Sequence, residues 1–342
     1  MAIGRTLDQV VGGLSRFLHL RAARENTVGD LGPYFDLTPA QLFPAPAPLR
    51  DMVRHQSLLD RALHTTALSW KSTHEILCPR YQLRHDRDYH RNHTAYARLV
   101  RPPGKRRRTA LVYVHGWLEP GSWVEEATLF RQWKHTIDAD FVHIALPFHG
   151  QRSPAHSLFS GELFWTADLV RSMEGVRQAV CDTRALIDWL RAEGYDRVGV
   201  AGLSLGGALV MLLACLEPAP DFAIPIIGHL QLQDVVENAP ILWRMKHDLE
   251  GWGVHESQRR ELFRRVGLSA YTPVLAPERQ LWIEARDDVY IDAALVEAQW
   301  ERWHRPHLFW LPGGHMTIVL NMGAMTRRMA DFINGVPPGA AS

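Results

Sequence analysis

Cysteine is scarce in this chain of 342 residues, in which Cys78, Cys181 and Cys215 are the only three. They are too few and too widely spaced for a disulfide framework, and no two of them stand at a metal-ligand spacing. A reducing compartment is therefore expected. The N-terminus lacks the apolar core of a signal peptide and no apolar run is long enough to span a membrane, so we expect a cytoplasmic protein.

An excess of charge of either sign is also lacking, because 38 Lys and Arg residues face 37 Asp and Glu residues. Without a broad positive field, nucleic acid is not an expected partner. We expect a small-molecule partner and no stable membrane insertion. The share of hydrophobic residues, 46%, is that of an ordinary globular protein with a large core.

Residues 1–72 are expected to form an N-terminal helical arm. Apolar residues recur there at steps of three and four, which predicts one apolar helix face made of Leu7, Val10, Val11, Leu14, Phe17 and Leu18. We expect this face to pack on the main domain or on a second subunit, as in a homodimer; a place in a membrane interface is the alternative. A proline-rich connector, Phe43–Arg50, separates this helix from a second one expected around Leu49–Leu68.

Residues 73–342 alternate between short β-type runs and helical periods. Apolar runs typical of strands buried on both faces occur at 110–114, 141–146, 223–227, 281–285 and 307–311. A helical period from Val176 to Leu190 ends before Gly194, where a helix C-terminus favours glycine. Such alternation predicts an α/β fold with a mainly parallel sheet flanked by helices and a ligand site beyond the carboxyl ends of its strands.

A serine lies at the end of one of these runs, in Gly202-Leu203-Ser204-Leu205-Gly206. A β-type run precedes it and an alanine- and leucine-rich helical segment follows it. This is the strand-turn-helix context of a nucleophile elbow, in which small residues two before and two after the serine allow a strained turn. We therefore expect Ser204 to be a catalytic nucleophile.

A serine hydroxyl needs a base to remove its proton, and the base needs an acid to orient it. Among 18 histidines, His315 is the one that follows a glycine-rich bend after the last predicted strand and precedes a terminal helix. Asp287 and Asp288 follow an earlier strand-like run and lie between Ser204 and His315, the order typical of this fold. These patterns leave both aspartates open as the acid.

An oxyanion needs hydrogen-bond donors that are already in place. The backbone amide of Leu205, directly after the nucleophile, is one expected donor. His115-Gly116-Trp117 follows an earlier strand and offers the amide of Trp117 as the second, with its ring lining the acyl pocket. The alternative for this tripeptide is an ordinary strand-ending turn with a packed tryptophan.

Over roughly residues 75–335 the chain resembles the alpha/beta hydrolase superfamily, and most closely the branch called abhydrolase domain-containing protein 18. The matching stretches are "HGW" at His115, "PFHGQRSP" at Pro147–Pro154, "LIDWLRAEGYDRVGVAGLSLGG", "ARDDVYI" and "LPGGHMT". The resemblance implies serine hydrolase chemistry. It also favours Asp288 as the acid, because members of the branch carry a single aspartate before a tyrosine-isoleucine pair. One departure is Asp292, where a proline is common.

A cap and a substrate pocket are expected around this centre. The segment at about 229–279 is long for a simple crossover and predicts a helical cap that includes Trp243. With Trp243 we expect His115, Gly116, Phe148 and Trp165 to bind substrate, and an apolar acyl or aromatic ester fits these residues best. The run "HDRDYHRNH" at His85–His93 lacks a helix-face spacing of its histidines, so neither a metal nor a cofactor is expected.

The function expected from these patterns is that of a cofactor-free carboxylesterase with the triad Ser204, Asp288 and His315 and an acyl-enzyme intermediate. Two alternatives stay open at this stage. An acyltransferase would use the same triad with an alcohol or thiol in place of water. A non-catalytic binding protein would keep the hydrolase core and use the N-terminal arm as its contact surface.

Overall fold

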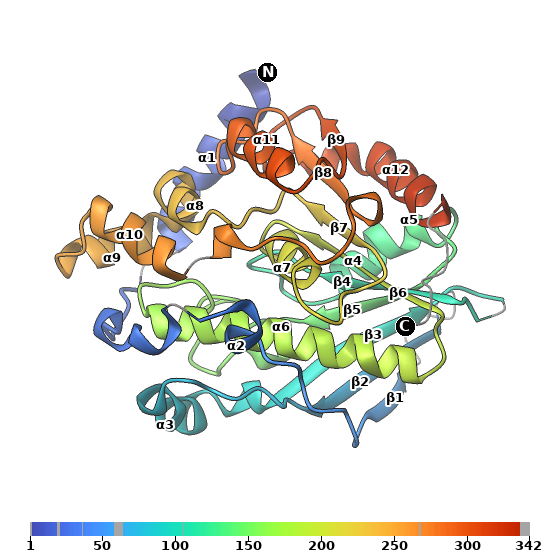
Figure 1. The fold of residues 1–342 in the computed structure, drawn as a ribbon, viewed down its shortest axis with the longest axis horizontal. Coiled ribbons are helices and arrows are strands. Elements are labelled where there is room, and N and C mark those ends of the chain that lie inside the picture. The colour runs from blue at the N-terminus through green and yellow to red at the C-terminus, as the bar shows by residue number, and fades with distance from the viewer. Residues whose placement is uncertain are drawn as a thin grey trace.

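A nine-stranded sheet with the strand order β1-β2-β3-β5-β4-β6-β7-β8-β9 runs through the molecule (Figure 1). The computed structural model describes residues 2–18, 21–35, 37–57, 64–104, 106–266 and 268–335. Pairing is antiparallel from β1 through β2 and β3 to β5, and parallel from β5 across to β9. The strands are β1 Val53–Ser57, β2 His64–Lys71, β3 Thr94–Arg101, β4 Thr109–Val114, β5 Asp140–Ala145, β6 Arg197–Leu203, β7 Ala223–Ile226, β8 Leu281–Ala285 and β9 His307–Leu311.

Helices cover both faces of this sheet (Figure 1). Successive residues of β4 alternate between the two faces, so that Val112 packs in one hydrophobic core and Leu111 and Tyr113 pack in the other. Residues of α6 and α7 fill the first core, and residues of α5 and α12 fill the second. The helices are α1 Ala2–Leu18, α2 Pro39–Leu42, α3 Pro79–Asp88, α4 Trp123–Glu125, a π-helical turn Glu126–Phe130, α5 Arg131–Trp133, α6 Leu169–Ala192, α7 Leu205–Ala214, α8 Leu232–Asn238, α9 Trp243–Gly251, α10 Glu256–Val266, α11 Ala293–Arg302 and α12 Met322–Gly335.

The expected fold class is confirmed, since the sheet is mainly parallel and lies between helices. β4, which reads as a continuous apolar run, is buried along its whole length. Between β7 and β8 the chain forms α8, α9 and α10, the helices of the segment for which a cap was expected. At the departure noted above, Asp292 caps α11 by accepting a hydrogen bond from the amide of Ala294 at 2.8 Å.

The expectation of a helical arm up to residue 72 is wrong, because β1 and β2 lie where a helix around Leu49–Leu68 was expected. The strand β2 instead pairs with β3 in an antiparallel manner, and its residues Thr65, Leu68 and Trp70 are buried. Pairing with another strand sets the secondary structure of this segment, and the local sequence does not reveal such pairing. The sheet therefore begins at Val53.

The helix α1 forms as expected, but the described part of it docks through a different face. Gly4, Asp8 and Gly12 face the protein: a Cβ on Gly4 would lie 2.6 Å from the amide nitrogen of Gly314, and one on Gly12 would overlap Pro240. Of the expected apolar face, Leu7 is 39% and Val10 is 52% exposed. The side chains of Leu14, Phe17 and Leu18 lie outside the described residues. Glycines allow α1 a close approach to the body of the protein, and the carboxylate of Asp8 is buried between them.

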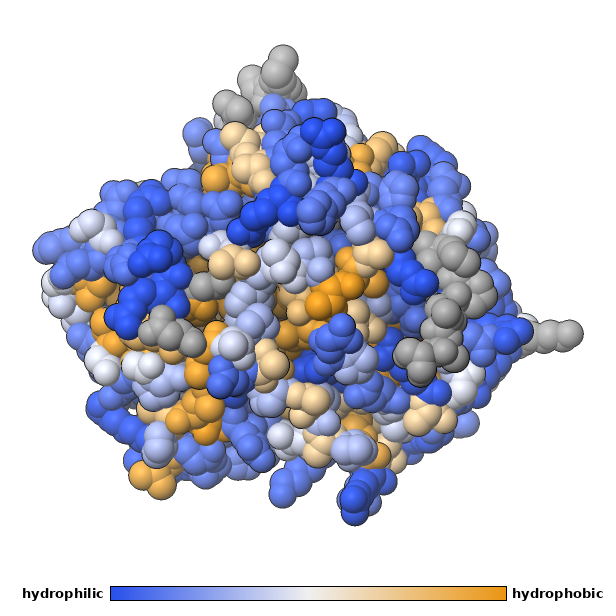
Figure 2. Space-filling view, in the orientation of Figure 1, coloured by the Kyte–Doolittle hydropathy of each residue, from blue (hydrophilic) through white to orange (hydrophobic). Residues whose placement is uncertain are grey.

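Within the described ranges, no helix is both long and apolar enough to cross a membrane. On the face seen in Figure 2, hydrophilic residues predominate and hydrophobic ones are scattered among them.

A buried ion pair ties the Pro147–Pro154 motif to α6. Arg152 and Asp182 are 0% and 1% exposed, and their charged groups lie 2.9 Å apart. Arg152 also donates to the backbone carbonyls of Ala145 and Asn92, both at 3.1 Å. Because the guanidinium is enclosed by these acceptors, removing its counter-charge leaves an uncompensated charge in the interior.

Asp182→Asn is therefore expected to lower the free energy of unfolding by about 3 kcal/mol, as measured by urea denaturation. The matched control is Asp188→Asn on the same helix, where the side chain is 44% exposed and lies 3.7 Å from Arg191. That change is expected to cost less than about 1 kcal/mol. Equal small losses in both variants would contradict the role given to the buried pair.

Candidate active site

Ser204 lies between the end of β6 and the start of α7 with a strained backbone. Its φ of 55° and ψ of −112° belong to a region that residues with a side chain rarely adopt. The hydroxyl is thereby held beyond the carboxyl end of β6, at the N-terminus of α7. Free amides and the positive end of the helix dipole lie there, and both favour a developing negative charge.

Close backbone contacts require glycine at both positions that flank Ser204 in the elbow, Gly202 and Gly206. A Cβ on Gly202 would lie 2.5 Å from the carbonyl carbon of Gly206 and 2.9 Å from the carbonyl oxygen of Val114. A Cβ on Gly206 would overlap the same Val114 oxygen at the end of β4. The turn therefore exists only because neither position carries a side chain.

The structure brings Ser204, His315 and Asp288 into one hydrogen-bonded chain. Ser204 Oγ lies 2.8 Å from Nε2 of His315, and Nδ1 of His315 lies 2.6 Å from Oδ2 of Asp288. Because the Asp288 carboxylate accepts a hydrogen bond from the Nδ1–H group, the Nε2 lone pair is free to accept the proton of the serine hydroxyl. This arrangement is that of a nucleophile, a base and an orienting acid.

Asp288, and not Asp287, is the aspartate that contacts His315. Its second oxygen accepts hydrogen bonds from the amides of Tyr290 at 2.7 Å and Ile291 at 3.1 Å, which fix the carboxylate. The ring of Tyr290 stacks on the imidazole of His315, with centroids 4.5 Å apart. This stacking was not anticipated from the sequence, because only the fold brings the two rings together.

Asp8 is a further residue that was missed, and it comes from the opposite end of the chain. Its carboxylate is 0% exposed and accepts hydrogen bonds from the amides of His315 at 2.7 Å and Met316 at 2.9 Å. It also lies within 3.4 Å of the amide of Val289. A charged side chain of α1 thus joins the loop of His315 to the loop of Asp288. The Gly4-Asp8-Gly12 spacing of one polar and two small residues on one helix face was the signal available in the sequence.

Opposing effects set the pKa of His315. Burial alone would lower it, but the charge of Asp288, the hydrogen bond to that carboxylate and the charge of Asp8 outweigh burial and raise the pKa above its ordinary value. For a neighbouring carboxyl, Glu284, burial, reinforced by the charge of Asp288, raises the pKa well above the usual range.

Asp8→Asn should therefore lower the pKa of His315, since the negative charge that favours the imidazolium is lost. Titration of the His315 ring protons by NMR measures this shift. Glu284→Gln is the matched control and should leave the pKa of His315 unchanged, because the charges that raise this pKa are those of Asp288 and Asp8. A pKa that stays constant or rises in Asp8→Asn would contradict the influence assigned to this carboxylate.

The expected oxyanion residues lie next to the serine. Leu205 is the first residue of α7, and Trp117 lines the same pocket as Ser204. Gly116 packs so closely that a Cβ there would lie 3.9 Å from that of Ser204. The indole nitrogen of Trp117 donates to the carbonyl of Gly161 at 2.8 Å, which fixes the ring. The loop after β4 thus forms part of the wall of the pocket at Ser204.

The pocket at Ser204 is small and mostly apolar, with a volume of ≈ 80 Å³. It is lined by Trp117, Trp165, Ser204, Leu205, Ala208, His229, Leu232, Val235, Val236, Ala239, Ile241, Leu242, Tyr290, Ile291 and His315. Of the five residues expected to bind substrate, Trp165 is among them. Helix α8 and the turn before α9 supply much of the apolar wall.

The other four expected substrate contacts, His115, Gly116, Phe148 and Trp243, do not line this pocket. His115 is a structural residue: its Nδ1 bonds the Gly116 carbonyl at 2.7 Å, its Nε2 accepts from the Leu146 amide at 3.0 Å, and burial lowers its pKa to about 4. Phe148 is fully buried against the ring of Tyr89. Trp243 packs beside His247 on α9 and does not line the pocket.

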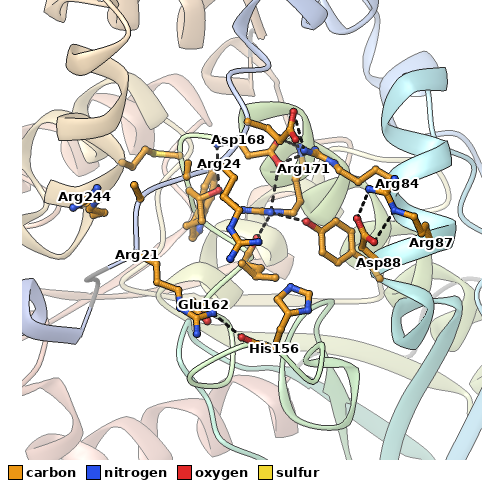
Figure 3. Close-up of a pocket in the computed structure, with 18 residues that line it drawn as sticks. Arg21, Arg24, Arg84, Arg87, Asp88, His156, Glu162, Asp168, Arg171 and Arg244 are labelled. Atoms are coloured by element: carbon orange, nitrogen blue, oxygen red, sulfur yellow. Dashed lines mark hydrogen bonds and ion pairs between the residues drawn. The ribbon is translucent and has the colours of Figure 1, made fainter.

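Figure 3 shows a second pocket, of ≈ 360 Å³, which shares Trp165 with the first. Its wall is rich in arginine: Arg21, Arg24, Arg84, Arg87, Arg171 and Arg244. Carboxylates compensate several of these charges, as in the pairs Arg84–Asp168 at 2.6 Å and Arg244–Asp248 at 2.8 Å. The amide of Ala23 donates to Asp248 at 2.7 Å. This pocket marks the seam between the segment after α1 and helices α3, α6 and α9.

The segment His85–His93 is helical, although its histidines lack a helix-face spacing in the sequence. α3 begins with Pro79 at its first position and ends at Asp88, and a 3-10 turn covers His90–His93. The fold brings one ligand atom each of His85, Asp86 and His93 within 4.8 Å of one another. Asp86 is 52% and His93 is 41% exposed, and they form an ion pair at 3.1 Å. This cluster lies at the surface.

Comparison with solved structures identifies the fold. An acetyl xylan esterase from a Paenibacillus species matches with a TM-score of 0.60 and 14% identity over 97% of this chain and 94% of its own. An esterase of Pyrococcus furiosus matches with a TM-score of 0.54 and 14% identity over 87% of this chain and 99% of its own. At these identities the likeness shows the fold, and the chain has that of the alpha/beta hydrolases.

Sequence comparison indicates which branch of the alpha/beta hydrolases this chain resembles. Residues 137–232 match the family described as alpha/beta hydrolase domain containing 18, so the resemblance expected from the motifs is confirmed. An uncharacterised protein of Mycobacterium tuberculosis is 32% identical over 235 residues, which are 66% of this chain and 54% of that protein. The chain thus spans about half the length of the curated relative that it matches.

Proposed function

We propose that this chain is a serine hydrolase that cleaves carboxylic esters of short apolar acids, with Ser204, His315 and Asp288 as its triad. The single observation that carries the proposal is the hydrogen-bonded chain from Ser204 through His315 to Asp288, at 2.8 and 2.6 Å, with the serine on a strained turn. The esterase fold of the solved neighbours is consistent with it, although the same fold supports other chemistries.

In the acylation step, Nε2 of His315 takes the hydroxyl proton of Ser204 as Oγ attacks the ester carbonyl. The amides of Leu205 and Trp117 donate to the oxyanion that forms. Collapse of the tetrahedral intermediate breaks the ester bond, and the imidazolium returns its proton to the leaving alcohol. Asp288 stabilises the imidazolium throughout without taking its proton.

In the second step, water loses a proton to His315 and attacks the acyl-enzyme. A second tetrahedral intermediate collapses, the carboxylic acid leaves, and Ser204 Oγ regains its proton. Asp8 and Tyr290 position the imidazole for both steps, because one holds the backbone of His315 and the other holds its ring.

Asp288→Asn should lower kcat for a p-nitrophenyl ester by about 1,000-fold or more, because an amide in this place no longer holds the required tautomer. Asp287→Asn, its immediate neighbour, should keep kcat within a few-fold. Ser204→Ala sets the background of the assay. An Asp287→Asn variant that loses more activity than Asp288→Asn would contradict the triad.

The volume of the pocket bears on the acyl group. At ≈ 80 Å³ it is smaller than the roughly 150 Å³ cavity that accommodates benzene. Its walls offer aliphatic and aromatic carbon with few polar groups, so burial of each methylene is favourable until the space is filled. We therefore propose acyl chains of about two to four carbons as the preferred substrates.

Leu232→Ala should move the preference for acyl length upward, because Leu232 is 8% exposed and lines the pocket from α8. The ratio of kcat/KM for octanoyl esters to that for butyryl esters is expected to rise about 10-fold or more. A rise of this size corresponds to the free energy of burying a few additional methylene groups. Leu262→Ala makes the same truncation on α10, away from the pocket, and should leave the ratio unchanged. Parallel changes in both variants would indicate a general loosening of α8 and α10.

A further inference from the structure

Two glutamates and a histidine meet behind the loop that carries Trp117. Glu119 belongs to this loop, Glu125 ends α4, and His143 lies in β5. One ligand atom of each lies within 4.8 Å of the other two, and Nε2 of His143 is 3.7 Å from Oε2 of Glu125. Three segments of the chain thus present ligands of the kind that divalent metals bind.

The facing atoms of this cluster are unsatisfied. His143 is 3% exposed, and its Nε2 has no hydrogen-bond partner in the part of the chain that the structure describes. Oε2 of Glu125, which is 5% exposed, has none either. Buried polar atoms without partners are rare in native proteins, and a bound ion at the point where they converge would satisfy both of these.

No basic side chain among the described residues neutralises the two carboxylates. Arg98 is held by Glu126, through hydrogen bonds of 2.5 and 3.0 Å. The carboxyl group of Glu119 is hydrogen-bonded to that of Glu125, and it also accepts a hydrogen bond from the amide of Gly121 at 3.2 Å. The site therefore combines two acidic groups and one imidazole, and a cation would replace the proton that the two carboxyl groups share.

The spacing suits a metal of the zinc type. Ligand atoms about 2.1 Å from a tetrahedral metal lie roughly 3.4 Å from one another, and small side-chain torsions close the gap from 3.7 Å. Glu119 and His143 also line a cavity of ≈ 720 Å³, from which water can supply the fourth ligand. The ring of His143 is held by stacking on His115, with centroids 5.3 Å apart.

We propose that Glu119, Glu125 and His143 bind one divalent zinc-type metal ion, which joins the loop after β4 to α4 and β5. This site is separate from Ser204 and stands whether or not the chain is an esterase.

The loop after β4 contains a strained residue that a bound metal ion would restrain. Leu118 has a φ of 71°, a left-handed conformation that a leucine keeps only when its surroundings enforce it. Glu119 follows directly, so a metal bound there restrains the strained residue and its neighbour Trp117. The ion would act by holding this loop in place, and the carboxylates would replace water around it without taking part in bond breaking.

The test is titration of the chelator-treated full chain with zinc chloride by calorimetry. All proteins carry His93→Asn, which removes the surface cluster of His85, Asp86 and His93. The parent protein should bind one zinc ion per chain, and Glu125→Gln should weaken this binding more than about 100-fold. Glu126→Gln is the matched control, one residue along, and should bind as the parent does.

Thermal unfolding gives a second readout that is independent of activity. Zinc at a hundred-fold excess over its Kd should raise the Tm of the parent by about 4 °C and leave that of Glu125→Gln unchanged. If Glu125→Gln does not fold, Glu119→Gln on the loop serves in its place. The proposal would be overturned if the parent bound no zinc, or if Glu125→Gln, or Glu119→Gln in its place, bound zinc as tightly as the parent. The two carboxyl groups would then share a proton and hold no metal ion.

Discussion

The close approach of the Ser204 turn to the end of β4 is the constraint on which the site depends. The Val114 carbonyl leaves no space for a side chain at Gly206, and Gly206 leaves none at Gly202. Within that space the backbone of Ser204 adopts its strained conformation and α7 begins directly behind it. The pairing of β4 with β6 therefore fixes where the hydroxyl points, and the edge of the sheet becomes a place for chemistry.

The partners of this serine are held by contacts that reach across the whole chain. His315 is fixed by Asp288, by the ring of Tyr290 and by the carboxylate of Asp8. Asp8 belongs to α1, which approaches the loop of His315 through glycines, so the first helix takes part in the site. Its charge also shifts the proton equilibrium of the imidazole, because it lies buried near the ring.

Much of the sheet and the order of the site residues could be predicted from the sequence. Buried parallel strands read as apolar runs, and the elbow leaves a glycine signature because sterics demand it. The predictions that were wrong concern residues whose structure depends on distant contacts. The segment of β2 is a strand because it pairs with β3. His115 is structural because backbone groups form hydrogen bonds with both of its ring nitrogens. Asp8 was missed for the same reason, since its partners lie at the other end of the chain.

The central claim is that Ser204 is an activated nucleophile, and reaction with a fluorophosphonate tests it most directly. Intact mass should show one adduct on the wild-type chain and none on Ser204→Ala, because the phosphorus reagent reacts with a serine whose proton is removed by His315. An unlabelled wild-type chain, or an adduct that persists in Ser204→Ala, would contradict the account.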